Sequence, residues 1–283
     1  MKAIDQTLLE KVIVERLRHS HKGDYGRLLL LGGTYPYGGA ISMSAIAAVK
    51  SGAGLVTVGT DKENISALHS HLPEAMAFSL KDKAILKEQL EKAEVILLGP
   101  GLREDAFGEE LVKRVFDSLR KEQILIVDGG ALGILAKGQF AFPSSLLILT
   151  PHQKEWERLS GIALEHQNTE TTARALSFFP QGTILVEKGP ATCIWQAGKT
   201  EYYQLEVGGP YQATGGMGDT LAGMIAGFAG QFHQASLYER VVVATYLHSA
   251  IAQELAQEHY LVLPTEISKA LPKTMKTISQ RGN

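Results

Sequence analysis

Residues 94–102 read Glu-Val-Ile-Leu-Leu-Gly-Pro-Gly-Leu, an apolar run that ends in Gly99-Pro100-Gly101. Such a run predicts a short strand that is buried on both faces, and Gly-Pro-Gly predicts a turn directly after it. The pattern recurs along the chain. Strands are predicted over residues 27–33, 54–60, 94–98, 123–128, 145–150 and 183–187, and helices over 39–51, 84–93, 109–120, 155–159 and 169–179. This alternation predicts an α/β fold with a mostly parallel central sheet covered by helices on both sides.

The remainder of the chain departs from this alternation. Residues 191–207 alternate polar and apolar side chains around Gly198-Lys199, which predicts an antiparallel hairpin at the edge of the sheet. Helices are predicted over 219–230, over 236–258 and from 265 onward. No repeat, low-complexity tract or linker interrupts the sequence. We therefore expect one domain over residues 1–283.

Composition excludes several classes of protein. Of 283 residues, 45% are hydrophobic and 20% charged, and the net charge is −2. That charge gives no basic footprint for nucleic acid and no polybasic patch for a membrane surface. No apolar run is long enough to span a bilayer, and Asp5, Glu10 and Glu15 interrupt any signal-peptide core. A lone cysteine, Cys193, indicates a reducing compartment, so we expect a cytoplasmic protein.

Each predicted strand ends in residues suited to ligand contact. The strand ends carry Gly32-Gly33, Gly99-Pro100-Gly101-Leu102, Asp128-Gly129-Gly130, Thr150-Pro151-His152 and Lys188-Gly189-Pro190. In open α/β sheets, ligands bind beyond these carboxyl ends. The alternative for each turn is that Gly and Pro only end the strand and form the turn, without contacting a ligand. Asp128 in particular either lines the site or caps the next helix.

The sharpest candidate site is the segment Ala213-Thr214-Gly215-Gly216-Met217-Gly218-Asp219. Its glycines allow backbone N–H groups to converge on an anion at a helix N-terminus; we call residues 214–218 the anion loop. A carboxylate at Asp219 would stay ionised there and could act as general base for an alcohol. The alternative is that Asp219 only caps the helix. The chain contains neither a P-loop nor Gly-x-Gly-x-x-Gly, so a Rossmann dehydrogenase lacks its fingerprint.

Thr-Gly-Gly-x-Gly-Asp at the start of a late helix resembles the anion hole and base of the ribokinase-like superfamily. Further motifs narrow the resemblance to the ADP/ATP-dependent NAD(P)H-hydrate dehydratases, the type found as the carboxyl-terminal domain of YjeF proteins. Those motifs are Gly38-Gly39-Ala40, Gly99-Pro100-Gly101-Leu102, Thr150-Pro151-His152 with Glu155, and Lys188-Gly189-Pro190-Ala191-Thr192. The resemblance covers about residues 10–275. It implies a ribokinase-like three-layer α/β/α sandwich.

The resemblance also implies a metabolite-repair reaction. NADH and NADPH can gain water across a nicotinamide double bond, and the 6-hydroxy adduct cannot carry hydride. The family removes that water from the S epimer at the expense of a nucleotide, with bacterial members converting ADP to AMP and phosphate. The implied cofactor is Mg²⁺ and the implied assembly is a homotetramer. The family's usual epimerase half is absent from this sequence, so a separate hydrate epimerase is the implied functional partner.

The resemblance assigns roles to particular residues. Asp219 would take the proton of the substrate hydroxyl, and the amides of Gly216, Met217 and Gly218 would stabilise the transferred phosphoryl group. The adenine nucleotide would lie against Lys188, Gly189, Pro190, Ala191, Thr192 and Gly218. The hydrated dinucleotide would contact Ala40, Gly101, His152 and Asp219. Glu155 would order Mg²⁺ through water.

The sequence departs from the family pattern at three places. Gln153-Lys154 replaces the usual Pro-Gly, Met217 replaces Thr or Ser, and Gly209-Pro210-Tyr211-Gln212-Ala213 replaces Asn-Pro-Gly-Met-Ala. Met217 removes a hydroxyl from the anion loop but leaves the backbone donors. Two alternatives use the same loop: a small-molecule kinase for an alcohol such as a vitamin precursor, and a nucleotide-binding protein without catalysis.

Overall fold

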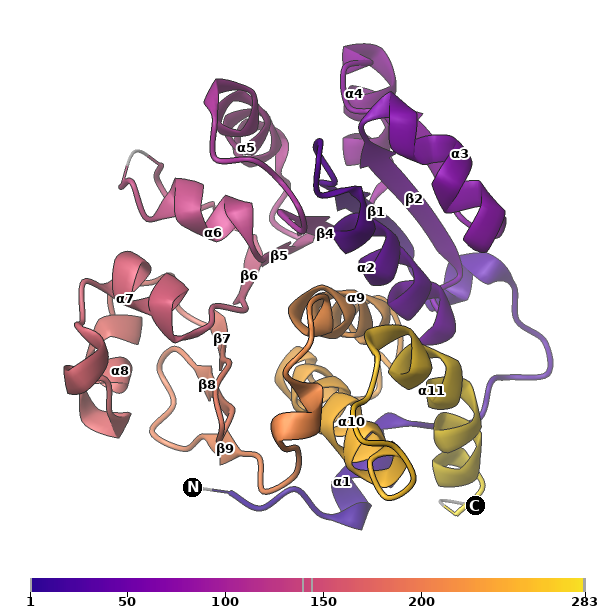
Figure 1. Cartoon of the computed structure of the whole chain (residues 1–283), viewed down its shortest axis with the longest axis vertical. Helices are drawn as coiled ribbons and strands as arrows, with labels where there is room; N and C mark the ends of the chain where they lie inside the picture. Colours follow the sequence, from indigo (N-terminus) through magenta and orange to yellow (C-terminus); the bar gives the residue numbers. More distant parts are fainter. Residues whose placement is uncertain (1, 139, 144, 282–283) are drawn as a thin grey trace.

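A twisted nine-stranded sheet forms the centre of the computed structural model, which describes residues 2–138, 140–143 and 145–281 (Figure 1). The strands are β1 (Arg27–Leu31), β2 (Leu55–Thr60), β3 (Met76–Ser79), β4 (Val95–Leu98), β5 (Ile124–Val127), β6 (Leu146–Leu149), β7 (Ile184–Glu187), β8 (Cys193–Gln196) and β9 (Tyr203–Gln204). Their order in space is β3-β2-β1-β4-β5-β6-β7-β8-β9. Neighbours from β3 to β7 are parallel, whereas β8 is antiparallel to both β7 and β9. The predicted parallel sheet with an antiparallel edge hairpin is confirmed.

Helices cover both faces of this sheet. One face carries α1 (Gln6–Val12), α2 (Gly38–Lys50), α3 (Lys62–His71), α9 (Met217–Ala229), α10 (Leu237–Leu255) and α11 (Pro264–Ser279). The other carries α4 (Lys83–Lys92), α5 (Ala106–Ser118), α6 (Gly130–Leu135), α7 (Gln153–Ser160) and α8 (Thr169–Leu176) (Figure 1). The three-layer α/β/α sandwich is confirmed. No helix among the described residues is both long and apolar enough to cross a membrane.

The central strands contribute to two separate cores. Leu28 and Leu30 of β1 pack into the core beneath α2 and α9, whereas Leu29 and Leu31 pack into the core beneath α4 and α5. Successive side chains of a strand point to opposite faces, so a strand covered on both sides must be apolar throughout. This is why the strands read as uninterrupted apolar runs in the sequence.

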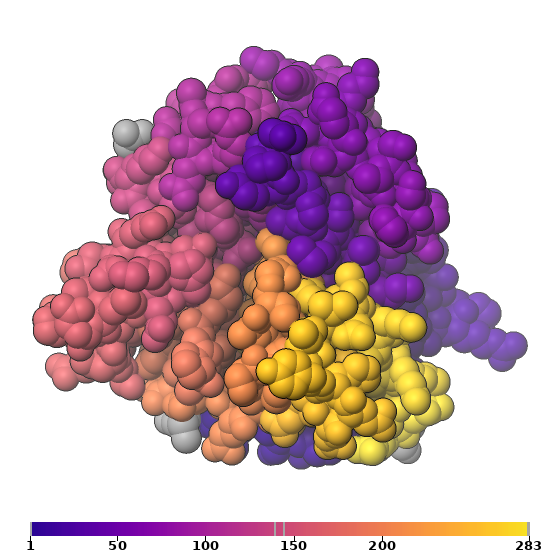
Figure 2. Space-filling view, viewed as in Figure 1, coloured from indigo at the N-terminus to yellow at the C-terminus, as the bar shows by residue number. Residues whose placement is uncertain are grey.

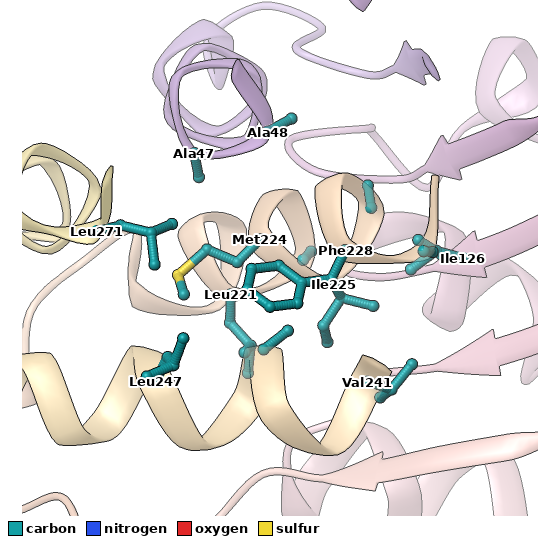
Figure 3. Packing of buried hydrophobic residues seen from close by; sticks show 14 of the residues in the cluster. Ala47, Ala48, Ile126, Leu221, Met224, Ile225, Phe228, Val241, Leu247 and Leu271 are labelled. Atoms are coloured by element: carbon teal, nitrogen blue, oxygen red, sulfur yellow. The ribbon is translucent and has the colours of Figure 1, made fainter. Parts of the chain in front are cut away.

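Helix α9 lies in the middle of the larger core. Its apolar side chains meet those of α2, α10, α11 and the sheet (Figure 3). Contact with α2 is closest at two glycines: a Cβ on Gly223 would lie 2.1 Å from the carbonyl oxygen of Ser44, and one on Gly227 would lie 2.5 Å from the Cβ of Ser51. The two backbones therefore touch where side chains would separate them. The Ser44 hydroxyl also donates to the carbonyl oxygen of Asp219 at 2.8 Å, which fixes the start of α9 against α2.

Loops from two central strands are joined at the carboxyl edge of the sheet. The chain leaves β1 toward β2 on one side, whereas β4 lies on the other side of β1. Beyond these strands, the N–H of Gly33 donates to the carbonyl of Pro100 at 2.8 Å, and that of Thr34 to the carbonyl of Gly101 at 2.9 Å. Ligands of open α/β sheets bind where neighbouring strands diverge in this way. The fold therefore places a candidate site above β1, β4 and β5.

Candidate active site

The anion loop has the geometry of an anion-binding helix start. Helix α9 begins at Met217, and its N-cap Gly216 has φ 94°, a left-handed conformation that favours glycine. The first N–H groups of a helix have no acceptor within it, and here they belong to Met217, Gly218 and Asp219. The positive end of the helix dipole lies at the same point. The loop can therefore hold a phosphoryl group by backbone donors alone.

Asp219 lies in the first turn of α9, largely buried. Burial raises the pKa of this carboxyl to about 6; the negative charge of Asp128 adds to the rise and the ammonium of Lys188 opposes it. The sequence predicts that the helix start favours the ionised form of Asp219. The pKa is nevertheless displaced upward rather than downward, because burial outweighs the favourable charges. A carboxylate with a pKa near 6 is a better proton acceptor than an exposed one.

Lys188 follows β7 and extends toward the anion loop. Its Nζ lies 2.9 Å from Oδ1 of Asp128 and 3.9 Å from Oε2 of Glu155, and its side chain is 18% exposed. A Cβ on Gly218 would lie 3.1 Å from this Nζ. Burial by itself would lower the pKa of Lys188, but the nearby carboxylates, Asp128 foremost, raise it above its ordinary value. The group is thus a permanent positive charge at the entrance of the loop.

Asp128 neither caps a helix nor reaches the surface of the site, so the structure fits neither of the two alternatives that the sequence left open. The N-cap of α6 is Gly129, with no side-chain capping bond. The Asp128 carboxylate instead accepts hydrogen bonds from the Lys188 ammonium and from the Thr150 hydroxyl at 2.7 Å. It is 2% exposed, so it lies behind Lys188 rather than at the surface of the site.

His152 and Glu155 form the start of α7. Nδ1 of His152 accepts from the N–H groups of Lys154 and Glu155, and Oε2 of Glu155 accepts from the N–H of His152 at 2.8 Å. Burial raises the pKa of Glu155 to about 7, and burial together with Lys188 lowers the pKa of His152. His152 also bridges to Lys188 through the backbone. Within residues 2–138, 140–143 and 145–281, no group of three or more His, Cys, Asp or Glu could hold a metal ion.

Ala40 and Gly101 lie next to each other. Gly101 has φ 64°, and a Cβ there would lie 3.0 Å from the Cβ of Ala40. Ala40 is in the first turn of α2, and Ser44, one turn further on, is bonded to Asp219. The structure thus brings Ala40 and Gly101 together, and Ser44 connects the helix that carries Ala40 to the backbone of Asp219.

A cavity of about 630 Å³ opens beside the anion loop. Six predicted site residues line it: Lys188, Gly189, Pro190, Thr192, Met217 and Gly218. In the space-filling view, the orange segment that carries the loop lies between the pink segment with α7 and the yellow C-terminal helices (Figure 2). A second cavity, of about 580 Å³, lies between the segment around Arg16 and α11 and contains none of the predicted residues.

His248 is one of several residues of the cavity wall that were not predicted as site residues. It lies within α10, 5% exposed, with its ring bonded to the backbone of Met217 and its Nε2 buried without a partner. Burial lowers its pKa to about 4, so the ring is neutral. The sequence around it, Tyr-Leu-His-Ser-Ala, carries no signal that distinguishes it from a packed helix residue.

Comparison with known proteins extends these findings. The family model described as NAD(P)H-hydrate dehydratase matches residues 28–273. An ADP-dependent (S)-NAD(P)H-hydrate dehydratase from Streptococcus pneumoniae is 78% identical over 99% of this chain and 97% of its own. The crystal structure of an ADP/ATP-dependent NAD(P)H-hydrate dehydratase from Bacillus subtilis, co-crystallised with ATP/Mg²⁺, has a TM-score of 0.83 and 28% identity over 97% of each chain. A bifunctional NAD(P)H-hydrate repair enzyme from Coxiella burnetii is 36% identical over 87% of this chain, which covers 49% of that enzyme.

Proposed function

The chain belongs to the NAD(P)H-hydrate dehydratase family, and we propose how its site removes water from hydrated NADH and NADPH. The enzyme acts on the S epimer and converts ADP to AMP and phosphate. One observation carries the assignment of the site: a buried carboxylate, Asp219, lies at a helix start whose free N–H groups and neighbouring Lys188 can hold a phosphoryl group.

The reaction needs a better leaving group than hydroxide. Asp219 takes the proton of the substrate hydroxyl, whose oxygen bonds to the β-phosphorus of ADP as the bond to the departing AMP breaks. The carbon–oxygen bond of the phosphate ester then breaks. Phosphate leaves with the electron pair, and the neighbouring ring carbon loses a proton to restore the double bond. The anion loop stabilises the charge that develops on the phosphoryl oxygens.

The two substrates lie on opposite sides of Asp219 in this proposal. The nucleotide occupies the cavity lined by Lys188, Gly189, Pro190 and Thr192, with Ala191 beside them and its terminal phosphate at Gly218. The hydrated dinucleotide lies toward Ala40 and Gly101 and extends to His152. Two contacts support this arrangement: the Ser44 hydroxyl connects α2 to the backbone of Asp219, and Lys188 lies beside Gly218, the residue before Asp219.

Mg²⁺ would enter with the nucleotide rather than bind to a preformed cage. Both the solved relative crystallised with ATP/Mg²⁺ and the lack of a three-residue ligand group in the described chain support this. Glu155, already bonded to the N–H of His152, fits a contact through water. The bound ion would neutralise negative charge on the phosphates.

A kinase that stops at the phosphate ester would use the same base and loop. The 78% identity to a dehydratase favours dehydration. Incubation of the purified protein with S-hydrated NADH, Mg²⁺ and either ADP or ATP separates the two. Recovery of the reduced-nicotinamide absorbance that requires nucleotide supports the dehydratase. Nucleotide consumption with accumulation of a stable phosphate ester would instead identify a kinase.

Four further proposals concern the whole protein. One domain over residues 1–283 is supported by the single sheet whose strands span residues 27–204. A homotetramer is supported by the family resemblance, and light scattering tests it. A cytoplasmic location is supported by the lone Cys193. A separate hydrate epimerase as functional partner is supported by the bifunctional relative, of which this chain covers about half.

A further inference from the structure

We propose that Asp128 is a positioning residue for phosphoryl transfer: it holds the ammonium of Lys188 at the anion loop, where that ammonium contacts the transferred phosphoryl group. This inference rests on the proposed function of the same site. It assigns a role in the reaction to a buried carboxylate that touches neither substrate, and it places Lys188 at the reacting phosphate rather than at the remainder of the nucleotide.

Three neighbouring strand ends build this arrangement. Asp128 follows β5, Thr150 follows β6 and Lys188 follows β7, so parallel pairing brings the three side chains to one edge of the sheet. Oδ1 of Asp128 accepts from the Thr150 hydroxyl at 2.7 Å and from Nζ of Lys188 at 2.9 Å. Asp128 and Thr150 are 2% and 1% exposed. The acceptor is therefore fixed from behind, and only the ammonium faces the loop.

A lysine side chain has four rotatable bonds and would otherwise sample many positions. The bond to Asp128 selects the one in which Nζ lies beside Gly218, 3.1 Å from where a Cβ of that residue would be. An ammonium has three N–H donors, and this bond uses one of them. The absence of a side chain at Gly218 leaves room for a phosphoryl oxygen next to the remaining donors. Lys188 can thus add a charged donor to the backbone donors of the loop.

Three carboxylates from three elements face Lys188: Asp128 at the end of β5, Glu155 on α7 and Asp219 on α9. Glu155 is 3.9 Å away and is bonded to the backbone of His152, so it is a poor substitute for Asp128. Asp128 also acts on Asp219, because its charge contributes to the raised pKa of that carboxyl. Removal of the Asp128 charge therefore has two separable consequences, one for the transferred phosphate and one for the base.

The test begins with Asp128→Asn, which keeps the shape and removes the charge. Wild-type turnover of S-hydrated NADH is measured first, and its absence would overturn the proposed function itself. We expect the variant to lower kcat about ten- to a hundredfold, the range seen for residues that orient groups in metal sites, with a smaller change in KM for ADP. The acid limb of its pH–rate profile should move to lower pH. A variant that only unfolds more easily, with kcat and the acid limb unchanged, would overturn the positioning role alone.

Glu187→Gln is the matched control. Glu187 is also a largely buried carboxyl at a strand end, but it faces Trp195 and Thr172 instead of the site. Its neutralisation should leave kcat and the pH profile as in the wild type. An equal loss in both variants would show that any buried carboxyl at this edge has the same effect, and would overturn the specific role of Asp128.

A double-variant cycle tests whether Asp128 acts through Lys188. In a Lys188→Met background, at a pH above the acid limb of every variant, Asp128→Asn should lower kcat little further, because the group that it positions is gone. Multiplication of the two losses would contradict the proposal. If Asp128→Asn does not fold, Thr150→Val replaces it: this change removes one bond to Asp128 and should lower kcat about two- to tenfold, the effect of one lost hydrogen bond. An unchanged kcat in folded Thr150→Val would then overturn the proposal.

Discussion

Asp219 lies where the proposed reaction needs a base, but burial makes its negative charge unfavourable for stability. Its pKa of about 6 means that the folded protein binds the proton more tightly than the unfolded chain does. The free energy of unfolding therefore falls as the pH rises from about 4 to about 6, and the full penalty is present at pH 8. We expect Asp219→Asn to lower turnover about 10²–10⁴-fold and to raise the free energy of unfolding at pH 8 by about 1–3 kcal/mol.

Urea unfolding at pH 5 and pH 8 measures the stability effect, and recovery of nicotinamide absorbance measures turnover. The increase in the free energy of unfolding caused by Asp219→Asn should be larger at pH 8 than at pH 5. Retained activity in Asp219→Asn would remove the base assignment, and a stability loss at pH 8 would show that the ionised carboxylate has favourable partners in the folded state.

The pH dependence of the reaction follows from the same group. Asp219 must be ionised to accept a proton, so kcat/KM should fall tenfold for each unit of pH below about 6. Rates measured from pH 5 to pH 8 in buffers of constant ionic strength check this. A rate that stays level down to pH 5 would mean that another group limits the reaction.

Gly216 gives the anion loop its left-handed turn. We expect Gly216→Ala to lower turnover, because a side chain at φ 94° is strained and its Cβ would lie 2.3 Å from Sδ of Met43. Gly161→Ala is the control, since Gly161 has φ 72° with nothing within 4 Å and ends α7. Both changes should lower stability by about 1–2 kcal/mol, but only the first should affect kcat. Equal effects on kcat would show that the loop conformation is not what matters.

At the scale of single residues, the sequence predicted those site residues that belong to a local motif. The glycines of residues 215–218 predicted the helix start with its donors, and the position of Lys188 after a strand predicted a place at the sheet edge. The partner of Asp128 could not be predicted, because Lys188 is 60 residues away along the chain. His248 could not be predicted as a residue of the cavity wall, because its position there depends on which face of α10 meets the cavity.

Helices α2 and α9 depend on their glycine contact. Gly223→Ala would place a methyl group against the backbone of Ser44, which cannot move aside as a side chain can. We expect a loss of stability of about 1–3 kcal/mol, with a decrease in kcat because the Ser44–Asp219 bond is disturbed. Thermal unfolding and turnover of the same preparation measure both.

Gly39→Ala, in the first turn of α2, is the control for Gly223→Ala. Open space surrounds Gly39, so alanine there should leave stability unchanged or raise it by up to about 1 kcal/mol. A Gly223→Ala variant as stable as Gly39→Ala would show that the two helices can separate without loss.

Elements with strong apolar runs were predicted to within a few residues, as β4 and α2 show. β3 was not predicted, because its four residues Met-Ala-Phe-Ser include an exposed Met76 and carry little apolar signal. α3 was not predicted either: Leu68 is its one buried residue, so it lacks an apolar stripe of the usual width. Elements at the edge of the fold bury fewer apolar side chains, so their sequences carry a weaker apolar pattern.

The order of strands lies beyond any local pattern. The amino-acid sequence predicted parallel strands and the antiparallel edge. It did not predict the spatial order β3-β2-β1-β4, which decides where the loops after β1 and β4 meet. That order depends on which apolar faces pack best over the whole molecule. The candidate site could still be assigned, because all parallel strands present their carboxyl ends at one edge.

Selectivity for one epimer has a consequence for the complete reaction. With a mixture of R- and S-hydrated NADH, we expect this protein to restore the absorbance of the S fraction quickly and then to slow to the rate of spontaneous epimerisation. Addition of a purified hydrate epimerase should remove the slow phase. Complete recovery in one fast phase without epimerase would contradict selectivity for the S epimer.

The backbone contact between α2 and α9 connects two parts of the proposed site. Ala40 lies one turn before Ser44 on α2, and Ser44 contacts Gly223 and donates to the carbonyl oxygen of Asp219 on α9. In the proposed reaction, the separation of the hydroxyl and the phosphorus would then depend on how closely these two helices pack, so that a side chain at Gly223 would alter a distance in the site as well as the packing of the core.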